Sequence, residues 1–324
     1  MGKSLASISL DLDNKWSYLK THGDPGWETF PSYLDLVVPR FLKVLNQYQI
    51  KITVFVVGQD AALEKNHQAL SMIAQAGHEI GNHSFHHEPW LHLYSSAELD
   101  AEFEKSEAAI HKATGQKTIG FRGPGFSLSQ DTLRVLARRG YEYDCTTFPT
   151  FLGPLARAYY FFSSRLSKRE KQERKALFGK FSDGFQSLRP YRWQMEDSEL
   201  LEIPVTTMPF FKTPIHLSYL LFLSSFSRLA AKLYFWKAMT LCQLTGVEPS
   251  LLLHPLDFLG ADDDRGLAFF PAMDLPSERK LKLVGEVLKM MTERYHVVPL
   301  REYAYHAIER NRLRKRGIQF ARAG

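Results

Sequence analysis

The stretch Gly81-Asn82-His83-Ser84-Phe85-His86-His87 follows a short apolar segment at 79–80 and carries three histidines. His83 and His87 stand four residues apart, so on a helix both would project from one face. Two neutral imidazoles on one face suit a divalent metal of the zinc type. His86 stands three residues from His83, which is also same-face spacing, and remains an alternative. A metal site of this kind usually needs a third ligand from elsewhere in the chain. The fold must therefore place the segment that supplies this ligand beside the two histidines.

Two carboxylates that suit this role come early in the chain. Ser9-Leu10-Asp11-Leu12-Asp13 ends an apolar segment that we expect to be the first strand. Asp11 and Asp13 share a parity, so on an ideal strand both side chains face the same cavity. An isolated pair of this kind is more often a turn or a helix cap.

Two further stretches place polar residues where a strand is expected to end. Phe121-Arg122-Gly123-Pro124-Gly125-Phe126 offers an arginine that can orient a carboxylate, and glycines that let backbone N–H groups approach a ligand. The alternative is a tight turn with a solvated arginine. Leu251-Leu252-Leu253-His254 puts a histidine after a buried segment, where a lone histidine is more often part of the core.

Short apolar segments alternate with longer helical patterns, which is typical of a parallel sheet or barrel. In a parallel barrel the carboxyl ends of the strands carry the site. We expect helices at 32–48, 61–76, 95–113, 129–138 and 277–295. We expect strands at 6–10, 51–57, 79–80, 118–121, 142–144, 200–206, 251–253 and 296–298. The predicted fold is α/β, a distorted (β/α) barrel of about seven to eight strands with a helical insertion.

The predicted barrel has two parts, 1–147 and 247–310, and a basic tail follows at 311–324. Between the two parts, 148–246 is mainly an aromatic and basic helical insertion that includes one barrel strand near 200–206. The apolar run within 215–244 is too short to span a membrane. It is either a buried helix of a subdomain or a surface that rests on a membrane through 151–244.

Composition narrows the class of protein. The chain has 324 residues, 44% of them hydrophobic, enough for a large core in one or two domains. Cys145 and Cys242 form no disulfide framework, and the first residues lead straight into a strand pattern and not into a cleavable signal. These features predict a cytoplasmic protein. A net charge of +6 suits an anionic partner.

The four stretches, in this order, resemble the polysaccharide deacetylase family, carbohydrate esterase family 4. His83-Ser84-Phe85-His86-His87 matches its His-(Ser/Thr)-x-x-His motif, Arg122-Gly123-Pro124 its Arg-x-Pro turn, and Leu253-His254 its Leu-His motif. Asp11-Leu12-Asp13 resembles the Asp-x-Asp branch of the family, most of which has adjacent aspartates. The resemblance spans about 6–257 apart from the insertion, and the joint pattern is specific although each motif alone is weak.

The resemblance implies a metal-dependent N-deacetylase with assigned residue roles. Asp13, His83 and His87 would hold the metal, Asp11 would be the base oriented by Arg122, and His254 would be the acid. The turn of Gly123, Pro124, Gly125 and Phe126 would lie against the substrate, and a backbone N–H from this turn or from 11–14 would help to bind the oxyanion. Asp144, in Tyr143-Asp144-Cys145, is a candidate to orient His254. Zinc is the first choice, while cobalt, nickel, iron and manganese remain open.

Two other functions remain as alternatives. The first is a deformylase, or another amide hydrolase, that acts on a lipid-linked sugar phosphate or a small amide. The second is a carbohydrate-binding protein without catalysis. We expect the partner to be an acylated amino sugar or a lipid-linked glycan at the inner membrane face, and no nucleic acid. The pattern does not determine the oligomeric state.

Overall fold

The computed structural model describes residues 2–155, 158, 180–310 and 313–318, so part of the predicted insertion at 148–246 lies outside these residues. In this described part, ten strands form one sheet. The strands are β1 (Ser4–Leu12), β2 (Thr53–Val56), β3 (Glu79–Asn82), β4 (Gly120–Phe121), β5 (Tyr143–Asp144), β6 (Tyr191–Gln194), β7 (Glu199–Glu202), β8 (Ser250–Leu253), β9 (Tyr295–Val298) and β10 (Arg314–Gly317).

The strand order is β10-β6-β7-β5-β4-β3-β2-β1-β8, and β9 also pairs with β1. Only the β6–β7 hairpin is antiparallel among the pairs of the described part. In the register, Leu10 of β1 lies opposite Val54 on one side and Leu253 on the other. The parallel strands therefore end at one edge, where ligand sites of α/β folds lie.

The sheet curls toward a barrel. Phe55 of β2, Tyr143 of β5 and Leu201 of β7 belong to one buried cluster, although β3 and β4 separate β2 from β5 in the strand order. The β-ladder of the described part does not join β7 to β8, but the Thr206 N–H donates to the Ser250 carbonyl at 3.0 Å just beyond β7. The expected α/β fold with a mainly parallel sheet is confirmed.

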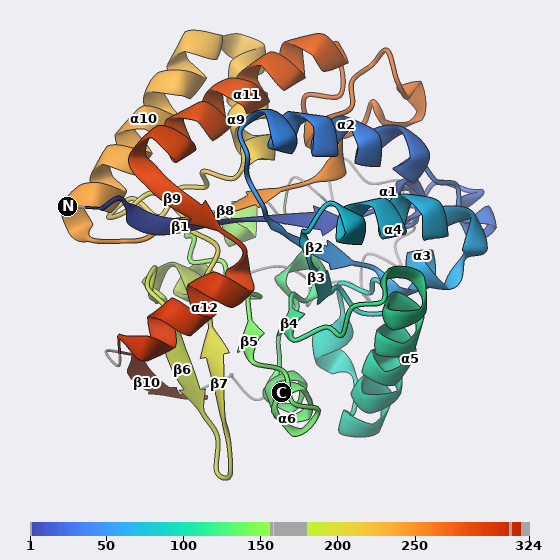
Figure 1. Cartoon of the computed structure of the whole chain (residues 1–324), viewed down its shortest axis with the longest axis vertical. Helices are drawn as coiled ribbons and strands as arrows, with labels where there is room; N and C mark the ends of the chain where they lie inside the picture. Colours follow the sequence, from blue (N-terminus) through green and yellow to red (C-terminus); the bar gives the residue numbers. More distant parts are fainter. Residues whose placement is uncertain (1, 156–157, 159–179, 311–312, 319–324) are drawn as a thin grey trace.

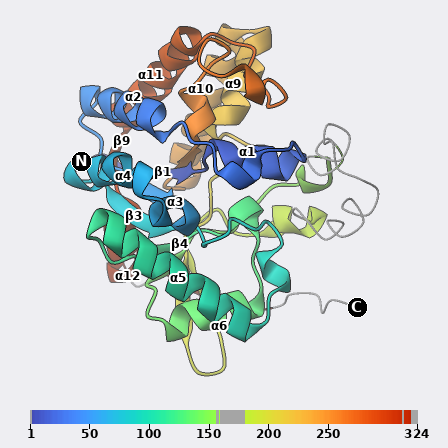
Figure 2. The ribbon, with the colours of Figure 1, turned by 90° about the vertical axis from the view of Figure 1, so that its right-hand side faces the viewer.

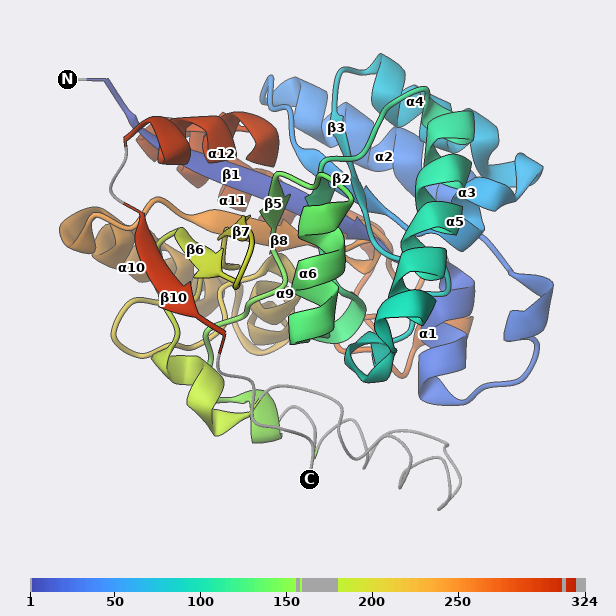
Figure 3. The same cartoon turned by 90° about the horizontal axis from the view of Figure 1, so that it is seen from below.

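Helices cover the outside of this sheet (Figures 1 and 2). The α-helices of the described part are α1 (Lys15–His22), α2 (Leu34–Gln47), α3 (Gly58–Ala62), α4 (His67–Gln75), α5 (Ser96–Thr114), α6 (Gln130–Arg138), α9 (Leu217–Phe226), α10 (Arg228–Thr245), α11 (Ser277–Arg294) and α12 (Leu300–Glu309). Figure 1 shows α2, α9, α10 and α11 together on one side of β1. From below, α5, α6 and α12 face the viewer (Figure 3).

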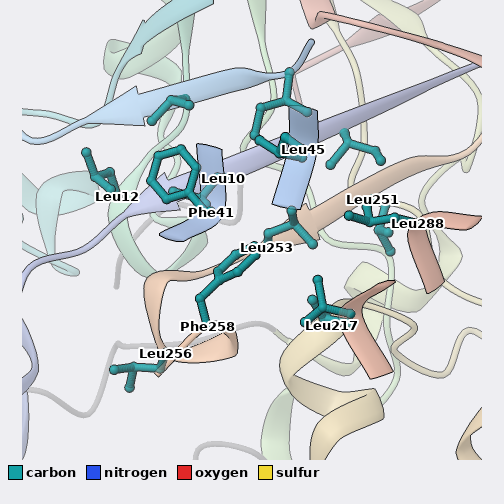
Figure 4. Packing of buried hydrophobic residues seen from close by; sticks show 14 of the residues in the cluster. Leu10, Leu12, Phe41, Leu45, Leu217, Leu251, Leu253, Leu256, Phe258 and Leu288 are labelled. Atoms are coloured by element: carbon teal, nitrogen blue, oxygen red, sulfur yellow. The ribbon is translucent and has the colours of Figure 1, made fainter. Parts of the chain in front are cut away.

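The largest core cluster lies between β1, β8 and the helices on that side. Figure 4 shows Leu10 and Leu253 of the strands facing Phe41 of α2, with Leu217 of α9 and Leu288 of α11 beside them. Alternate residues of β1 take part in this packing, so the other alternate set points into the barrel. That inward set is Ser7, Ser9 and Asp11, all of them buried.

The eight expected strands are all present, and two strands were not predicted. β6 pairs with β7, and β10, whose sequence is Arg-Lys-Arg-Gly, pairs with β6. Four residues of the region expected to be a tail thus extend the sheet. The apolar run at 215–244 is divided at Ser227 between α9 and α10. No helix in the described ranges is long and apolar enough to cross a bilayer.

Candidate active site

Asp11 is held by a fully buried arginine. One guanidinium nitrogen, Nη1 of Arg122, donates to Asp11 Oδ1 at 2.7 Å and to Ser9 Oγ at 2.8 Å. Nε of Arg122 donates to the Cys145 carbonyl at 3.0 Å, and the guanidinium lies 4.5 Å from the centre of the Phe55 ring. Arg122 is 0% exposed, so this ion pair is shielded from water and fixes the carboxylate in one orientation.

The backbone of Arg122 also orients His83. The ring nitrogen Nδ1 of His83 lies 2.6 Å from the Arg122 carbonyl oxygen. A carbonyl only accepts hydrogen bonds, so Nδ1 carries the hydrogen and the lone pair of neutral His83 lies on Nε2. A backbone carbonyl that fixes the tautomer in this way is the usual outer partner of a metal-binding histidine.

His83 and His87 come together in a loop. The expectation that they project from one face of a helix was therefore wrong. β3 ends at Asn82, and the following loop has Ser84 at φ 61° and His87 at φ 53°. These two left-handed residues turn the chain back on itself within four residues. The imidazole rings lie 5.1 Å apart, measured between their centres.

Asp13 completes a compact triad with these two histidines. Its Oδ1 lies 2.9 Å from Nε2 of His87 and 3.4 Å from Nε2 of His83. One potential ligand atom from each residue lies within 4.8 Å of the others, and in the described ranges no other such group of three was found. Nδ1 of His87 is buried and has no hydrogen-bond partner among the described residues.

The electrostatics of the triad favour a cation. Burial acts to raise the pKa of Asp13, but the His87 imidazole and hydrogen bonds from both histidines lower it far below its usual value. Burial acts to lower the pKa of His83, but the carboxylates of Asp11 and Asp13 raise it overall. The Asp13 carboxylate thus faces the imidazoles of His83 and His87, and a proton or a metal ion between these groups would stabilise the arrangement.

His86 points to a different partner. Its Nδ1 lies 2.6 Å from Oε2 of Glu102 on α5, and the backbone N–H groups of Phe85 and His86 donate to the other oxygen of Glu102. The side chain of His86 is 43% exposed, whereas that of His83 is 2% exposed. His86 therefore anchors the loop on α5, and the triad contains His87.

His254 follows β8 and contacts the first turn of α9. Its Nδ1 lies 3.2 Å from Ser218 Oγ, and the Ser218 hydroxyl donates to Asp257 Oδ1 at 2.7 Å. The His254 N–H donates to Asp257 Oδ2 at 2.8 Å. Ser218 has a single hydrogen to donate and an ionised Asp257 only accepts, so Nδ1–H of His254 donates to Ser218. This arrangement leaves Nε2 of His254 available for chemistry.

Asp144 is placed differently from its predicted role. In the described part its hydrogen bonds are with Thr146, whose hydroxyl donates to Oδ1 at 2.6 Å, and with Glu202. Burial raises the pKa of Glu202, and the Asp144 carboxylate raises it further, so Glu202 carries the proton of this pair. The groups that orient His254 are Ser218 and Asp257. Neither was predicted, although Asp257 stands three residues after His254.

In the turn at 123–126, one backbone N–H has no hydrogen-bond acceptor among the described contacts. The Gly123 N–H donates to Thr146 Oγ1 at 2.9 Å, and the Phe126 N–H donates to the Gly123 carbonyl at 3.0 Å. Pro124 has no N–H, so among the described contacts Gly125 is the only one of the four with an uncommitted N–H. Gly125 has φ 57°, and a Cβ there would lie 3.1 Å from Cβ of Pro89.

Aromatic rings connect this turn to His254. Phe126 stacks on Phe148 with ring centres 4.7 Å apart, and Phe148 meets the ring of His216 edge to face at 5.6 Å. His216 in turn lies 6.3 Å from His254. Burial, and then the neighbouring His254, lower the pKa of His216 to about 3, so the ring is neutral. These aromatic contacts were not predicted, because nothing in the sequence pattern relates Phe148 to His216.

Comparison with known proteins agrees with these observations. Residues 23–143 match the family model for polysaccharide deacetylase, a range that includes His83, His87 and Arg122. The chain is 29% identical over 147 residues to a peptidoglycan deacetylase of Helicobacter pylori, covering 43% of this chain and 48% of the relative. It is 31% identical over 105 residues to a peptidoglycan-N-acetylmuramic acid deacetylase of Bacillus subtilis, covering 32% and 39%. The chain thus spans less than half the length of these relatives.

One solved structure extends the likeness to almost the whole chain. It is a Mycobacterium smegmatis protein assigned to the polysaccharide deacetylases, with a TM-score of 0.65 and 20% identity. The alignment covers 99% of this chain and 95% of that one. At this identity the match concerns the fold, including the elements before 23 and after 143 that carry Asp11, Asp13 and His254.

Proposed function

The chain belongs to the polysaccharide deacetylase family, and we propose that it is a metal-dependent hydrolase that removes an N-acyl group from an amino sugar. One observation carries the proposal. The triad of Asp13, His83 and His87 lies at the strand ends beside a buried carboxylate–arginine pair, Asp11 and Arg122. A carboxylate base next to a Lewis-acid site is the arrangement that metal-assisted amide hydrolysis requires.

The triad fits a divalent metal of the zinc type. Two imidazoles and one carboxylate are a common donor set, and the Nδ1–H of His83 is already committed to the Arg122 carbonyl. When bound there, the metal would polarise the substrate carbonyl and lower the pKa of a coordinated water molecule. Zinc is our first choice, although cobalt, nickel, iron and manganese accept the same donors.

The residues of the chain supply the proton transfers. Asp11 is the proposed base, because the Arg122 guanidinium fixes Oδ1 and leaves the other oxygen to take the proton from the attacking water. His254 is the proposed acid, because Ser218 holds its Nδ1 and leaves Nε2 to protonate the departing amine. The Gly125 N–H is the proposed backbone donor to the oxygen that becomes negative in the transition state.

The names of the relatives support an acetylated glycan as the substrate class. Both curated relatives described above are named for peptidoglycan. A second candidate, deformylation or deacetylation of a lipid-linked sugar, is favoured by the exposed apolar side chains of α9 and α10. Ser218, which contacts His254, belongs to α9. The predicted cytoplasmic location, peripheral to the inner membrane face, remains a prediction.

An assay of acyl release tests this function. Purified protein is incubated with N-acetyl and N-formyl amino sugars, both free and lipid-linked, and with peptidoglycan fragments, with and without a chelator. We expect release of acetate or formate that stops with the chelator and returns when metal is added. Asp13→Ala should abolish release, whereas His86→Ala, at the histidine paired with Glu102, should retain most of it. Release that is unaffected by the chelator and by Asp13→Ala would contradict the proposal.

A further inference from the structure

One face of the α9–α10 hairpin is apolar and uncovered. Leu229, Leu233 and Trp236 of α10 are 66%, 57% and 51% exposed, and Leu244 is 77% exposed. Their spacings of four, three and eight residues place them on one stripe of the helix. Next to the start of α10, Phe226 at the end of α9 is 78% exposed. We call Phe226, Leu229, Leu233, Trp236 and Leu244 the α10 stripe.

The stripe is separate from the face of α10 that packs on the protein. Ala231, Phe235, Ala238, Met239 and Cys242 are all at most 1% exposed. α10 therefore has two apolar faces, one buried against the protein and one exposed. Figure 1 shows α10 at the periphery of the molecule, outside α11.

The segment that carries the stripe has basic but no acidic residues. From Ile203 to Val247 the sequence contains no Asp or Glu and four basic residues. Lys232 lies three residues after Leu229, and Lys237 lies one residue after Trp236. These helical spacings place the two lysines on opposite sides of the stripe. The neighbouring acidic residue of α11, Glu286, pairs with Arg228 and Lys232. The surface therefore suits an apolar partner that carries negative charge.

Two cation–aromatic contacts border the stripe. The guanidinium of Arg294 lies 5.4 Å from the centre of the Trp236 ring, and Nζ of Lys237 lies 5.5 Å from that of Phe211. Phe210 and Phe211, in the loop beside α10, are 73% and 56% exposed. Aromatic rings with an adjacent cation are typical of surfaces at the level of lipid headgroups, where the ring enters the acyl boundary and the cation stays in water.

We propose that the α10 stripe is a docking surface for an anionic lipid bilayer. The stripe side chains would enter the acyl boundary while Lys232, Lys237 and Arg294 contact the headgroups. A second copy of this chain fits less well, because symmetric contact would bring two acid-free, basic helices together. The partner we commit to is the bilayer surface.

Docking there would bring the candidate active site close to the membrane. α9 starts at Leu217, beside the Ser218 that contacts His254, and ends at Phe226 of the stripe. From Ser218 to Phe226 the helix rises by about 12 Å. If the proposed hydrolase function holds, this places amino sugars anchored at a bilayer surface within the substrate class. The docking itself does not depend on catalysis.

Vesicle flotation of the full chain tests the inference. The probes are vesicles of phosphatidylcholine alone and vesicles in which about one third is phosphatidylglycerol, each at low and high salt. We expect flotation with the anionic vesicles that weakens at high salt. The triple variant Leu229→Gln/Leu233→Gln/Trp236→Gln should bind at least about tenfold more weakly, because three exposed apolar side chains no longer enter the lipid.

A matched control uses exposed apolar residues of α12, which lies on the opposite side of β1 from α10 (Figure 1). Tyr305 and Ile308 are 61% and 39% exposed, and Tyr305→Gln/Ile308→Gln should float like the wild type. Lys237→Gln alone should weaken binding to anionic vesicles by about fivefold, and it gives a second measure if the triple variant does not fold.

Three results would overturn the inference: no flotation of the wild type, equal flotation of the Lys237→Gln variant, or stripe-dependent dimers in sedimentation without vesicle binding. Hydrolysis of a free amino sugar should be unchanged in the stripe variant. Flotation requires no turnover, so failure of docking and failure of the proposed hydrolase function are distinguishable.

Discussion

Ser218 connects His254 to Asp257, and its removal should impair proton donation without affecting the metal site. The Ser218 hydroxyl accepts from Nδ1 of His254 at 3.2 Å and donates to Asp257 at 2.7 Å. In Ser218→Ala the imidazole loses the group that fixes its orientation, and the buried Asp257 loses a hydrogen-bond donor. Asp13, His83 and His87 make none of these contacts.

The expected size of the effect follows from this hydrogen bond. A bond from a charged imidazolium is worth about 1.5–3 kcal/mol, and the 3.2 Å separation places this one near the lower end. A loss of about 1.4 kcal/mol lowers the population of the productive ring orientation about tenfold. We therefore expect kcat to fall about tenfold in Ser218→Ala, less than the 10²–10⁴-fold contribution typical of a general acid. Unfolding should become easier by about 1–3 kcal/mol because Asp257 Oδ1 is left without its partner.

The assay is acyl release with kcat and KM measured separately, together with bound metal and thermal unfolding. Ser224→Ala is the matched control, because Ser224 is a buried serine of the same helix whose hydroxyl donates to the Leu221 carbonyl at 2.7 Å. Ser218→Thr keeps the hydroxyl and should recover most of kcat. Equal kcat values for Ser218→Ala and Ser224→Ala would refute the orienting role, and so would an effect on KM alone.

Two further predictions concern Asp11 and Asp60. Asp11→Asn should lower kcat by about 10²–10⁴-fold while bound metal, measured by elemental analysis, stays at the wild-type level; loss of metal would instead assign Asp11 as a ligand. Asp60 is buried and accepts hydrogen bonds from Asn14, Trp16 and Asn66, and burial raises its pKa to about 7. Because the unfolded chain ionises near pH 4, the folded metal-free protein should lose up to about 4 kcal/mol of stability between pH 4 and pH 7 from this group. Urea unfolding across that range should show a flatter profile for Asp60→Asn, and identical profiles would contradict the assignment.

Much of the sheet could be predicted because its strands are continuous apolar segments followed by polar residues. β2 and β8 show this pattern most clearly, with apolar residues at 54–56 and 251–253. β10 could not be found in this way, since Arg314–Gly317 has no apolar residue and pairs only because β6 offers an edge. The division of 215–244 at Ser227 was missed because the apolar composition continues across it, while Ser227 caps α10 through its side chain.

The site shows what spacing alone leaves undetermined. The separation of His83 and His87 suggested a helix, but a loop with two left-handed residues produces the same convergence. The choice between His86 and His87 depends on Glu102, sixteen residues away on α5, which no local pattern identifies. Asp144 was selected by its motif, yet its carboxylate forms hydrogen bonds with Glu202 and Thr146. Side-chain partners across the barrel are set by the curl of the sheet.

Within the region 151–244, for which membrane contact was predicted, 156–157 and 159–179 lie outside the described residues. The domain limits at 147, 246 and 310 therefore remain predictions. The described part of the insertion contains both Ser218 and the α10 stripe. The same segment therefore contacts the proposed acid, His254, and forms the proposed docking surface.

The central claim is that Asp13, His83 and His87 form the metal site, and metal binding measures it directly. Metal-free protein is titrated with Zn²⁺ by calorimetry, and bound metal is determined after dialysis. We predict one equivalent for the wild type and for His86→Ala, and loss of tight binding for Asp13→Ala and His83→Ala. Tight binding of one equivalent by Asp13→Ala, or its loss in His86→Ala, would contradict the account.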